Sequence, residues 1–158
     1  MLNTKNAVVI ISSAMCMLFA SCLKSGLPDY PQNQLNFINK VYFEYRWADS
    51  TNMYNGSPVV AYMRLNVAQT IDSAHSTISL QLTVPAANGP FTAYQRSQVS
   101  LDHLWCSVDV SPAATVTPVD PAPKLGFAGD YSQPRQYKVS ANPGDARIWT
   151  LTVTSFTK

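Results

Sequence analysis

The chain has 158 residues, of which 46% are hydrophobic and 13% are charged, and its formal net charge is +2. This length suits one globular domain with a hydrophobic core. The lysines and arginines are scattered along the chain, so the sequence lacks the basic cluster typical of nucleic-acid binding, and we expect no nucleic-acid partner.

The first residues have the pattern of a bacterial export signal. Lys5 precedes an apolar run that is interrupted at residues 12–13 and ends near Ala20. This run is shorter than the roughly 20 residues that a transmembrane helix requires. Residues 1–21 are therefore predicted to form a cleavable signal peptide.

The signal ends in LFASC at residues 18–22, which resembles the lipobox of bacterial lipoproteins. The resemblance implies that Cys22 becomes the first residue of the mature protein and carries lipid that anchors it in the outer membrane. Residues 23–26 contain none of the acidic side chains that often follow this cysteine in surface-exported lipoproteins of Bacteroidota, which leaves the periplasmic and surface faces both open. An ordinary signal peptide with an incidental cysteine is the alternative.

The segment after the signal contains two prolines, a glycine and polar amides without hydrophobic periodicity. Residues 22–36 are therefore predicted to be a flexible, extended tether. The folded domain is expected to occupy residues 37–158.

Three strands are predicted in the first half of this domain, because apolar residues recur there with period two. They cover residues 41–47, 59–67 and 76–84, and residues 48–58 have the composition of a turn. The predicted core-facing residues are Val41, Phe43, Tyr45, Trp47, Val59, Ala61, Met63, Leu65, Val67, Ile78, Leu80, Leu82 and Val84.

One helical segment is predicted in the mature chain, within residues 91–104, where the alternation breaks. Thr92 is placed to cap a helix that ends near Gln98, and the segment is expected to cross between sheets. A strand is predicted after it at residues 104–110, and it contains Cys106, which would be the only cysteine of the mature domain. We expect a buried apolar role for Cys106 and no disulfide within the domain.

The last third of the chain carries a recognisable pattern. A proline-rich loop is followed by Tyr137 and Val139 in a strand, by Gly144 and Asp145 in a turn, and by an aromatic-Thr-x-Thr-Val strand at residues 149–153. This pattern resembles an immunoglobulin-like domain of unknown function that is common in cell-envelope lipoproteins of Bacteroidota. The resemblance implies the fold and an envelope setting, and the family has no catalytic residues to transfer.

The number of alternating segments independently predicts an all-β fold. About seven short strands with turn signals between them are typical of an immunoglobulin-like antiparallel β-sandwich with one short helical crossover. Residues from the C-terminal strands are expected to face the opposite sheet across the core: Tyr137, Val139, Trp149, Leu151 and Val153 against Phe43, Tyr45, Leu65 and Leu80.

The sequence lacks the G-x-S-x-G, H-E-x-x-H, paired C-x-x-C, P-loop and G-x-G-x-x-G motifs, and we expect neither catalysis nor a cofactor or metal. His75 and His103 are interpreted as solvated loop residues. Glycoside hydrolysis is the remaining alternative, because it requires only two suitably spaced acids, which Glu44, Asp102 and Asp109 would have to provide.

A ligand platform is predicted on the solvent side of the sheet, where aromatic rings stand beside polar groups suited to saccharides. Its residues are Trp105, Tyr42, Tyr62 and Arg64. The alternatives are that Phe91 or Tyr94 covers Trp105, that the outward tyrosines are ordinary strand residues, and that loop aromatics such as Tyr54 and Tyr131 bind the ligand instead.

These features together predict a non-catalytic, membrane-anchored envelope lipoprotein. It would be a binding or accessory module of a glycan-uptake type system, with glycan or envelope proteins as partners. A structural or assembly spacer that binds only protein partners is the alternative.

Overall fold

The computed structural model describes residues 35–141 and 145–158. Cys22, the predicted signal peptide and the tether as far as residue 34 lie outside the described residues, as does Gly144. In the part of the chain that is described, no helix is long and apolar enough to cross a membrane.

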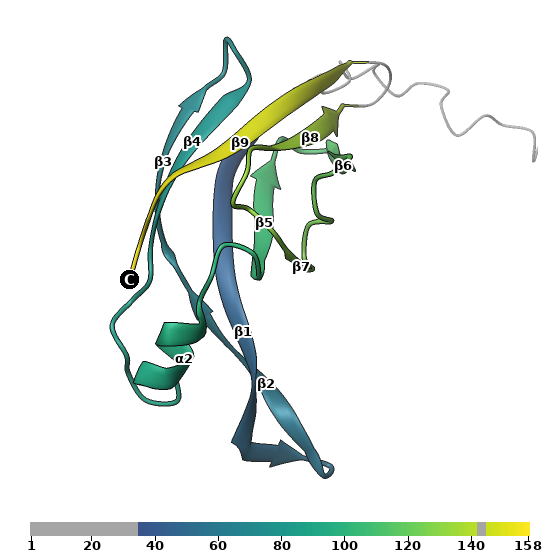
Figure 1. The fold of residues 1–158 in the computed structure, drawn as a ribbon. Coiled ribbons are helices and arrows are strands. Elements are labelled where there is room, and N and C mark those ends of the chain that lie inside the picture. The colour runs from purple at the N-terminus through teal and green to yellow at the C-terminus, as the bar shows by residue number, and fades with distance from the viewer. Residues whose placement is uncertain (1–34, 142–144) are drawn as a thin grey trace, which may run out of the picture. The chain divides into compact units, whose positions relative to one another are not determined.

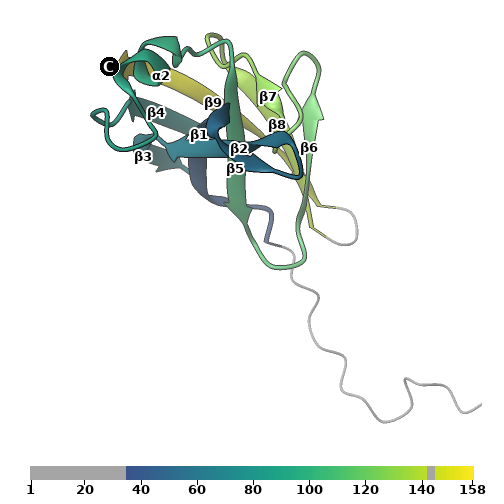
Figure 2. The ribbon, with the colours of Figure 1, turned by 90° about the horizontal axis from the view of Figure 1, so that it is seen from below.

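The described chain folds into two β-sheets that pack on each other, with one short helix (Figures 1 and 2). The four-stranded sheet has the order β2-β1-β5-β7, with bounds Ser57–Arg64, Ile38–Tyr54, Leu104–Val110 and Ala128–Gly129. The five-stranded sheet has the order β3-β4-β9-β8-β6, with bounds Asn66–Asp72, Thr77–Thr83, Ala146–Thr157, Arg135–Ser140 and Thr115–Val119. The predicted all-β sandwich is confirmed.

The helix α2 spans Ala93–Gln98 and connects β4 of one sheet to β5 of the other, as predicted. Thr92 is its N-cap, because the Thr92 side chain accepts a hydrogen bond from the Gln95 backbone N–H at 3.2 Å. This bond satisfies one of the donors that the first turn of a helix leaves unpaired. The short polar side chain at this position thus made the helix start readable in the sequence.

The strand count and one strand direction differ from the prediction. The described residues form nine strands rather than about seven, and β4 pairs with β9 in parallel, whereas the sequence predicted an antiparallel sandwich. β9 lies between β4 and β8 and runs antiparallel only to β8. Alternation reports which side of a strand faces the core but not its direction, so the sequence pattern did not contain this information.

The alternating run at residues 59–67 is two strands rather than the single strand that was predicted. β2 ends at Arg64 and β3 begins at Asn66, and the two belong to different sheets. Leu65 between them is buried, and its backbone N–H donates to the Phe43 carbonyl at 3.0 Å. The alternation continues through the switch because the odd-numbered residues face the core between the two sheets both before and after Leu65.

β1 extends well beyond the strand predicted at residues 41–47 and forms a hairpin with β2 (Figure 1). The turn is Asn55–Gly56, and both residues have positive φ, 48° and 79°. This Asn-Gly pair is typical of the two-residue turns that join twisted antiparallel strands. Residues 50–58 are all exposed, so the hairpin carries the end of β1 past the region covered by the second sheet.

The core lies between the two sheets, as predicted. Phe43, Tyr137 and Trp149 are fully buried there, and the Phe43 ring meets the Tyr131 ring edge-on at 5.0 Å. Leu80 is also buried, but it lies in the same sheet as Trp149 rather than across from it. Cys106 is 1% exposed and its thiol is free.

Candidate ligand-binding site

The four predicted platform residues share one face of the four-stranded sheet, the side that points away from the core. Glu44 of β1 stands opposite Arg64 of β2 on one side and Trp105 of β5 on the other, and Tyr62 stands opposite Arg46. Tyr42 belongs to the same face because it lies two residues from Glu44. We call this surface the outer face: Tyr42, Glu44, Arg46, Tyr62, Arg64, Trp105 and Asp109.

A carboxylate organises the outer face. The Glu44 side chain is only 13% exposed and forms ion pairs with both neighbouring arginines. The Arg46 Nη2 lies 2.9 Å from Oε2, and the Arg64 Nε lies 3.2 Å from Oε1. Arg46 lies on the same strand as Glu44 and Arg64 on the neighbouring strand, so the carboxylate joins β1 to β2.

The two arginines also lie over aromatic rings. The Arg46 guanidinium carbon is 5.7 Å from the centre of the Trp105 ring, and that of Arg64 is 5.9 Å from the Tyr42 ring. Cation–π contacts of this kind are worth about 0.5–1 kcal/mol at exposed sites. Glu44 therefore holds both guanidinium groups in place beside the rings.

Trp105 is partly exposed, and the cover by Phe91 or Tyr94 that the sequence left open is not found. Phe91 is fully buried and packs against Tyr45 and Trp47, while Tyr94 is 67% exposed. The neighbour of the Trp105 ring is instead His103, which meets it edge-on at 5.1 Å. Trp105 thus keeps access to solvent between His103 and Arg46.

The two tyrosines of the outer face differ in accessibility. The Tyr42 hydroxyl donates to Asp109 Oδ2 at 2.6 Å, and this hydrogen bond raises the pKa of Tyr42. The Lys40 ammonium lies 5.0 Å from the Tyr42 ring centre, so this ring is already occupied by cations. Tyr62 is 58% exposed and presents the most open ring of the face.

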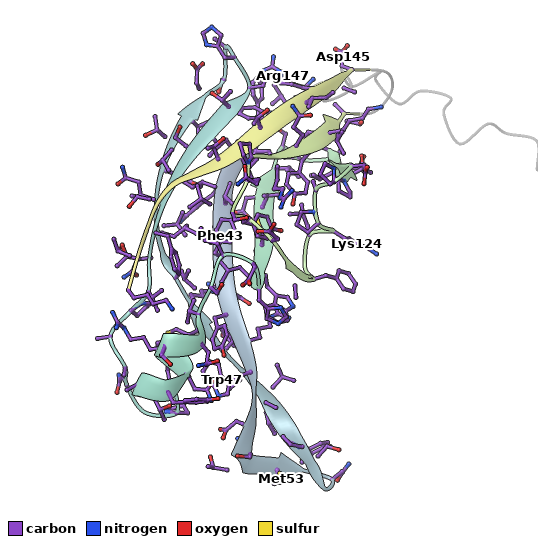
Figure 3. All side chains as sticks on the ribbon, viewed as in Figure 1. Phe43, Trp47, Met53, Lys124, Asp145 and Arg147 are labelled. Carbon is purple, nitrogen blue, oxygen red and sulfur yellow. The ribbon has the colours of Figure 1, made fainter. Side chains whose placement is uncertain are left out.

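A pocket of about 380 Å³ lies on the other side of β1, and the sequence did not reveal it. It is formed where the end of β1 meets the segment that leads into α2 (Figure 3). Trp47 was interpreted as a core residue and residues 48–58 as a turn. The lining residues are Trp47, Ala48, Asp49, Ser50, Thr51, Gly89, Pro90, Thr92 and Gln95.

The acids and histidines considered for catalysis are separated. His75 Nδ1 lies 2.7 Å from Asp72 Oδ2 in an exposed turn between β3 and β4. Asp102 is hydrogen-bonded to Ser100 in a loop, and Asp109 is bonded to Tyr42. Within the described residues, no cluster of three or more histidine, cysteine or acidic side chains that could hold a metal ion is found.

The fold and these surfaces define a two-sheet β-sandwich domain with a polar, aromatic outer face. The chain belongs to the DUF5018-related family, whose model matches residues 38–152. No curated protein matches it. It is similar to a crystal structure of a Bacteroides fragilis protein inferred to be secreted, with 36% identity and a TM-score of 0.74, covering 81% of this chain and 100% of that one. Both findings fit a Bacteroidota domain of unknown function.

Proposed function

We propose that the protein is a non-catalytic lipoprotein of the bacterial outer membrane that binds glycan on its outer face as a module of a glycan-uptake type system. Lipid on Cys22 anchors it. The similar Bacteroides fragilis protein, inferred to be secreted, supports export from the cytoplasm. The immunoglobulin-like resemblance of the C-terminal strands supports an envelope setting.

The observation that carries this proposal is the juxtaposition of rings and polar groups across three neighbouring strands. Tyr62 and Trp105 flank β1 on opposite sides, with Arg46 between them in register with Tyr62. An aromatic ring stacks on the apolar face of a sugar while nearby donors and acceptors bind its hydroxyl groups. An open sheet face favours an extended glycan chain over a small, enclosed ligand.

The spacing of the carboxylates supports a non-catalytic role. Asp109 pairs with Lys40, and Glu44 lies four residues further along β1. At about 3.3 Å per residue the two acids are roughly 13 Å apart along the strand. Inverting glycosidases need about 6.5–9.5 Å between their carboxyl groups and retaining ones about 5–5.5 Å, so the wider spacing of these two strand positions favours the non-catalytic proposal.

A second candidate function is a spacer or assembly subunit with only protein partners. The observation in its favour is a group of large apolar side chains exposed on the β1–β2 hairpin: Met53, Tyr54, Val60 and Tyr62. Contiguous exposed apolar surface is typical of protein interaction sites. A spacer would bind through this hairpin and would show no glycan affinity.

Glycan binding by the purified protein tests the proposal. Neutral and acidic oligosaccharides are titrated by calorimetry, and Trp105→Ala and Tyr62→Ala are each expected to weaken binding at least tenfold. Ile148→Ala is the control, because Ile148 is 52% exposed but lies on β9 of the other sheet. No affinity for any glycan, together with capture of an envelope protein that Met53→Ser abolishes, would favour the spacer instead.

A further inference from the structure

We propose that the pocket between the end of β1 and α2 is a separate binding site for one uncharged sugar residue. This inference goes beyond the proposed outer-face function, since the pocket uses different residues on the opposite side of β1. Its walls come from two segments that are far apart in the sequence, residues 47–51 and residues 89–95.

The first wall is built by an irregularity in β1. Asp49 pairs with Val59 and Met53 pairs with Pro58, so residues 50–52 stand in β1 with no residue of β2 opposite. A bulge of this kind bends its strand and turns side chains away from the regular ladder. Here it places Ser50 and Thr51 beside Asp49 at the pocket rather than along the sheet.

Hydrogen bonds hold this wall in place. Asp49 Oδ1 accepts from the Thr51 backbone N–H at 3.0 Å and from the Thr51 hydroxyl at 2.6 Å. These bonds lower the pKa of Asp49, the side-chain bond from Thr51 having the largest effect. The carboxylate is therefore ionised at neutral pH and is a ready acceptor for ligand hydroxyl groups.

The second wall is fixed by the loop before α2. Asn88 and Phe91 exchange backbone hydrogen bonds of 2.9 and 3.0 Å, which fixes Gly89 and Pro90 between them. Gln95 of α2 accepts a hydrogen bond from the Tyr45 hydroxyl through its side-chain oxygen at 3.3 Å. Because this contact engages the side-chain oxygen of Gln95, we expect its amide NH₂ to be the group that donates to a ligand.

Trp47 supplies the apolar surface of the pocket. Its ring stacks on Tyr45 at 5.8 Å with an angle of 18°, and it lies 5.7 Å from the buried Phe91 ring. The two contacts fix the orientation of the indole, which stays partly exposed at the pocket. Figure 3 shows Trp47 where β1 passes α2.

The charge of the lining selects the ligand class. Asp49 is the one ionisable side chain among the lining residues, and they include no lysine, arginine or histidine. Anionic ligands such as uronic acids or phosphates would meet the ionised carboxylate without a compensating cation. The pocket offers an aromatic ring for the apolar face of a ligand, and a carboxylate, hydroxyl groups and an amide for its polar groups. This combination suits an uncharged sugar.

The size of the pocket sets a limit on the ligand. A volume of about 380 Å³ falls at the lower end of the roughly 300–1,000 Å³ that is usual for small-molecule sites. It therefore suits one sugar residue, free or at the end of a glycan, rather than a long chain.

The site is tested on the whole protein with a panel of neutral methyl glycosides and disaccharides, by ligand-observed NMR and calorimetry. We expect Asp49→Asn to weaken binding of the panel's best ligand at least tenfold, because a charge-assisted hydrogen bond is lost. Trp47→Ala is expected to abolish binding. Asp72→Asn, at an exposed turn, is the matched control and is expected to have no effect.

Three outcomes would overturn the inference. One is that no neutral sugar binds at its highest soluble concentration, and another is that Asp49→Asn, which removes no ring packing, binds as tightly as the parent. A third is a preference for the matching uronic acid over the neutral sugar. Trp105→Ala separates the two proposals: it is expected to preserve pocket binding, whereas binding lost in Trp105→Ala and kept in Asp49→Asn would support the outer face alone.

Discussion

Trp149 is the residue that joins the start of the domain to its centre. It is fully buried, and its indole N–H donates to the Asn36 carbonyl at 2.9 Å, while the Phe37 ring meets it edge-on. Arg147 lies over the Phe37 ring at 5.0 Å and extends this contact. The segment just before β1 is thereby attached to β9, more than a hundred residues later in the chain.

We expect Trp149→Ala to lower the free energy of unfolding by about 3–5 kcal/mol, since a buried aromatic ring is replaced by a cavity. Urea titration measures the loss. Trp149→Phe is the control, because it keeps most of the ring and removes the bond to Asn36; a smaller loss is expected. A loss below about 1 kcal/mol for the alanine variant would mean that the ring does not fill the core.

Cys106, Tyr131 and Tyr137 form a buried group of acids that are protonated at neutral pH. The Tyr137 hydroxyl donates to the Pro123 carbonyl at 2.9 Å, so the 3.2 Å contact between the hydroxyls has Tyr131 as donor. Burial raises the pKa of the Cys106 thiol from 9.0 to about 12 and that of Tyr137 from 10.0 to about 12. Burial also raises the pKa of Tyr131.

These shifts predict loss of stability in alkali. Each folded-state pKa lies above the unfolded one, so the stabilisation is complete below about pH 9 and is lost as the pH rises from about 9 to about 12. Denaturant titrations across this pH range measure the free energy of unfolding. Cys106→Ala is expected to make that free energy fall less steeply with pH. If the Cys106 thiol of the folded protein reacted with a disulfide reagent at pH 8 as fast as in the unfolded chain, the raised pKa of Cys106 would be contradicted.

At the scale of elements, the β1–β2 hairpin depends on its two-residue turn. Gly56 has a φ of 79° and nothing within 4 Å of the position a Cβ would take, so the cost of a side chain there comes from the backbone alone. That cost is about 1–2 kcal/mol for a residue with a Cβ. The hairpin in turn positions the bulge that lines the pocket.

Gly56→Ala is expected to speed amide hydrogen exchange in the outer half of β1 and β2 without unfolding the sandwich. Gly126→Ala is a matched control, because Gly126 has a similar φ of 80° and equally open surroundings but lies in another loop. Hydrogen exchange followed by mass spectrometry distinguishes them. Unchanged exchange in the Gly56 variant would show that the turn does not limit the opening of the hairpin.

Element boundaries were readable in the sequence where local chemistry sets them. Thr92 marks the start of α2 because its hydroxyl pairs with a backbone donor three residues away. The switch of sheets at Leu65 was missed because no proline, glycine or change of period marks it. The change from one sheet to the other is set by hydrogen bonds to strands elsewhere in the chain, such as the bond from the Leu65 N–H to the Phe43 carbonyl.

At the scale of the whole molecule, the signal at residues 1–22 predicts where the protein works. Cys22→Ala is expected to leave unprocessed precursor or soluble protein, because the lipobox-like segment LFASC then lacks the cysteine that would carry lipid. Membrane fractionation and electrophoretic mobility report the outcome, with Cys106→Ala as the control that retains the anchor. Normal membrane attachment and mobility of Cys22→Ala would refute lipid anchoring.

The sequence by itself determined the all-β class, the buried positions of Cys106 and Trp149, and the shared outward side of Tyr42, Tyr62 and Trp105. Each of these follows from period two, since successive residues of a strand point to opposite sides. Only the tertiary structure decided the parallel pairing of β4 with β9 and the meeting of Trp47 and Asp49 with the segment before α2. Alternation does not indicate which strands are neighbours, because the hydrogen bonds that pair two strands join segments that are distant in the sequence.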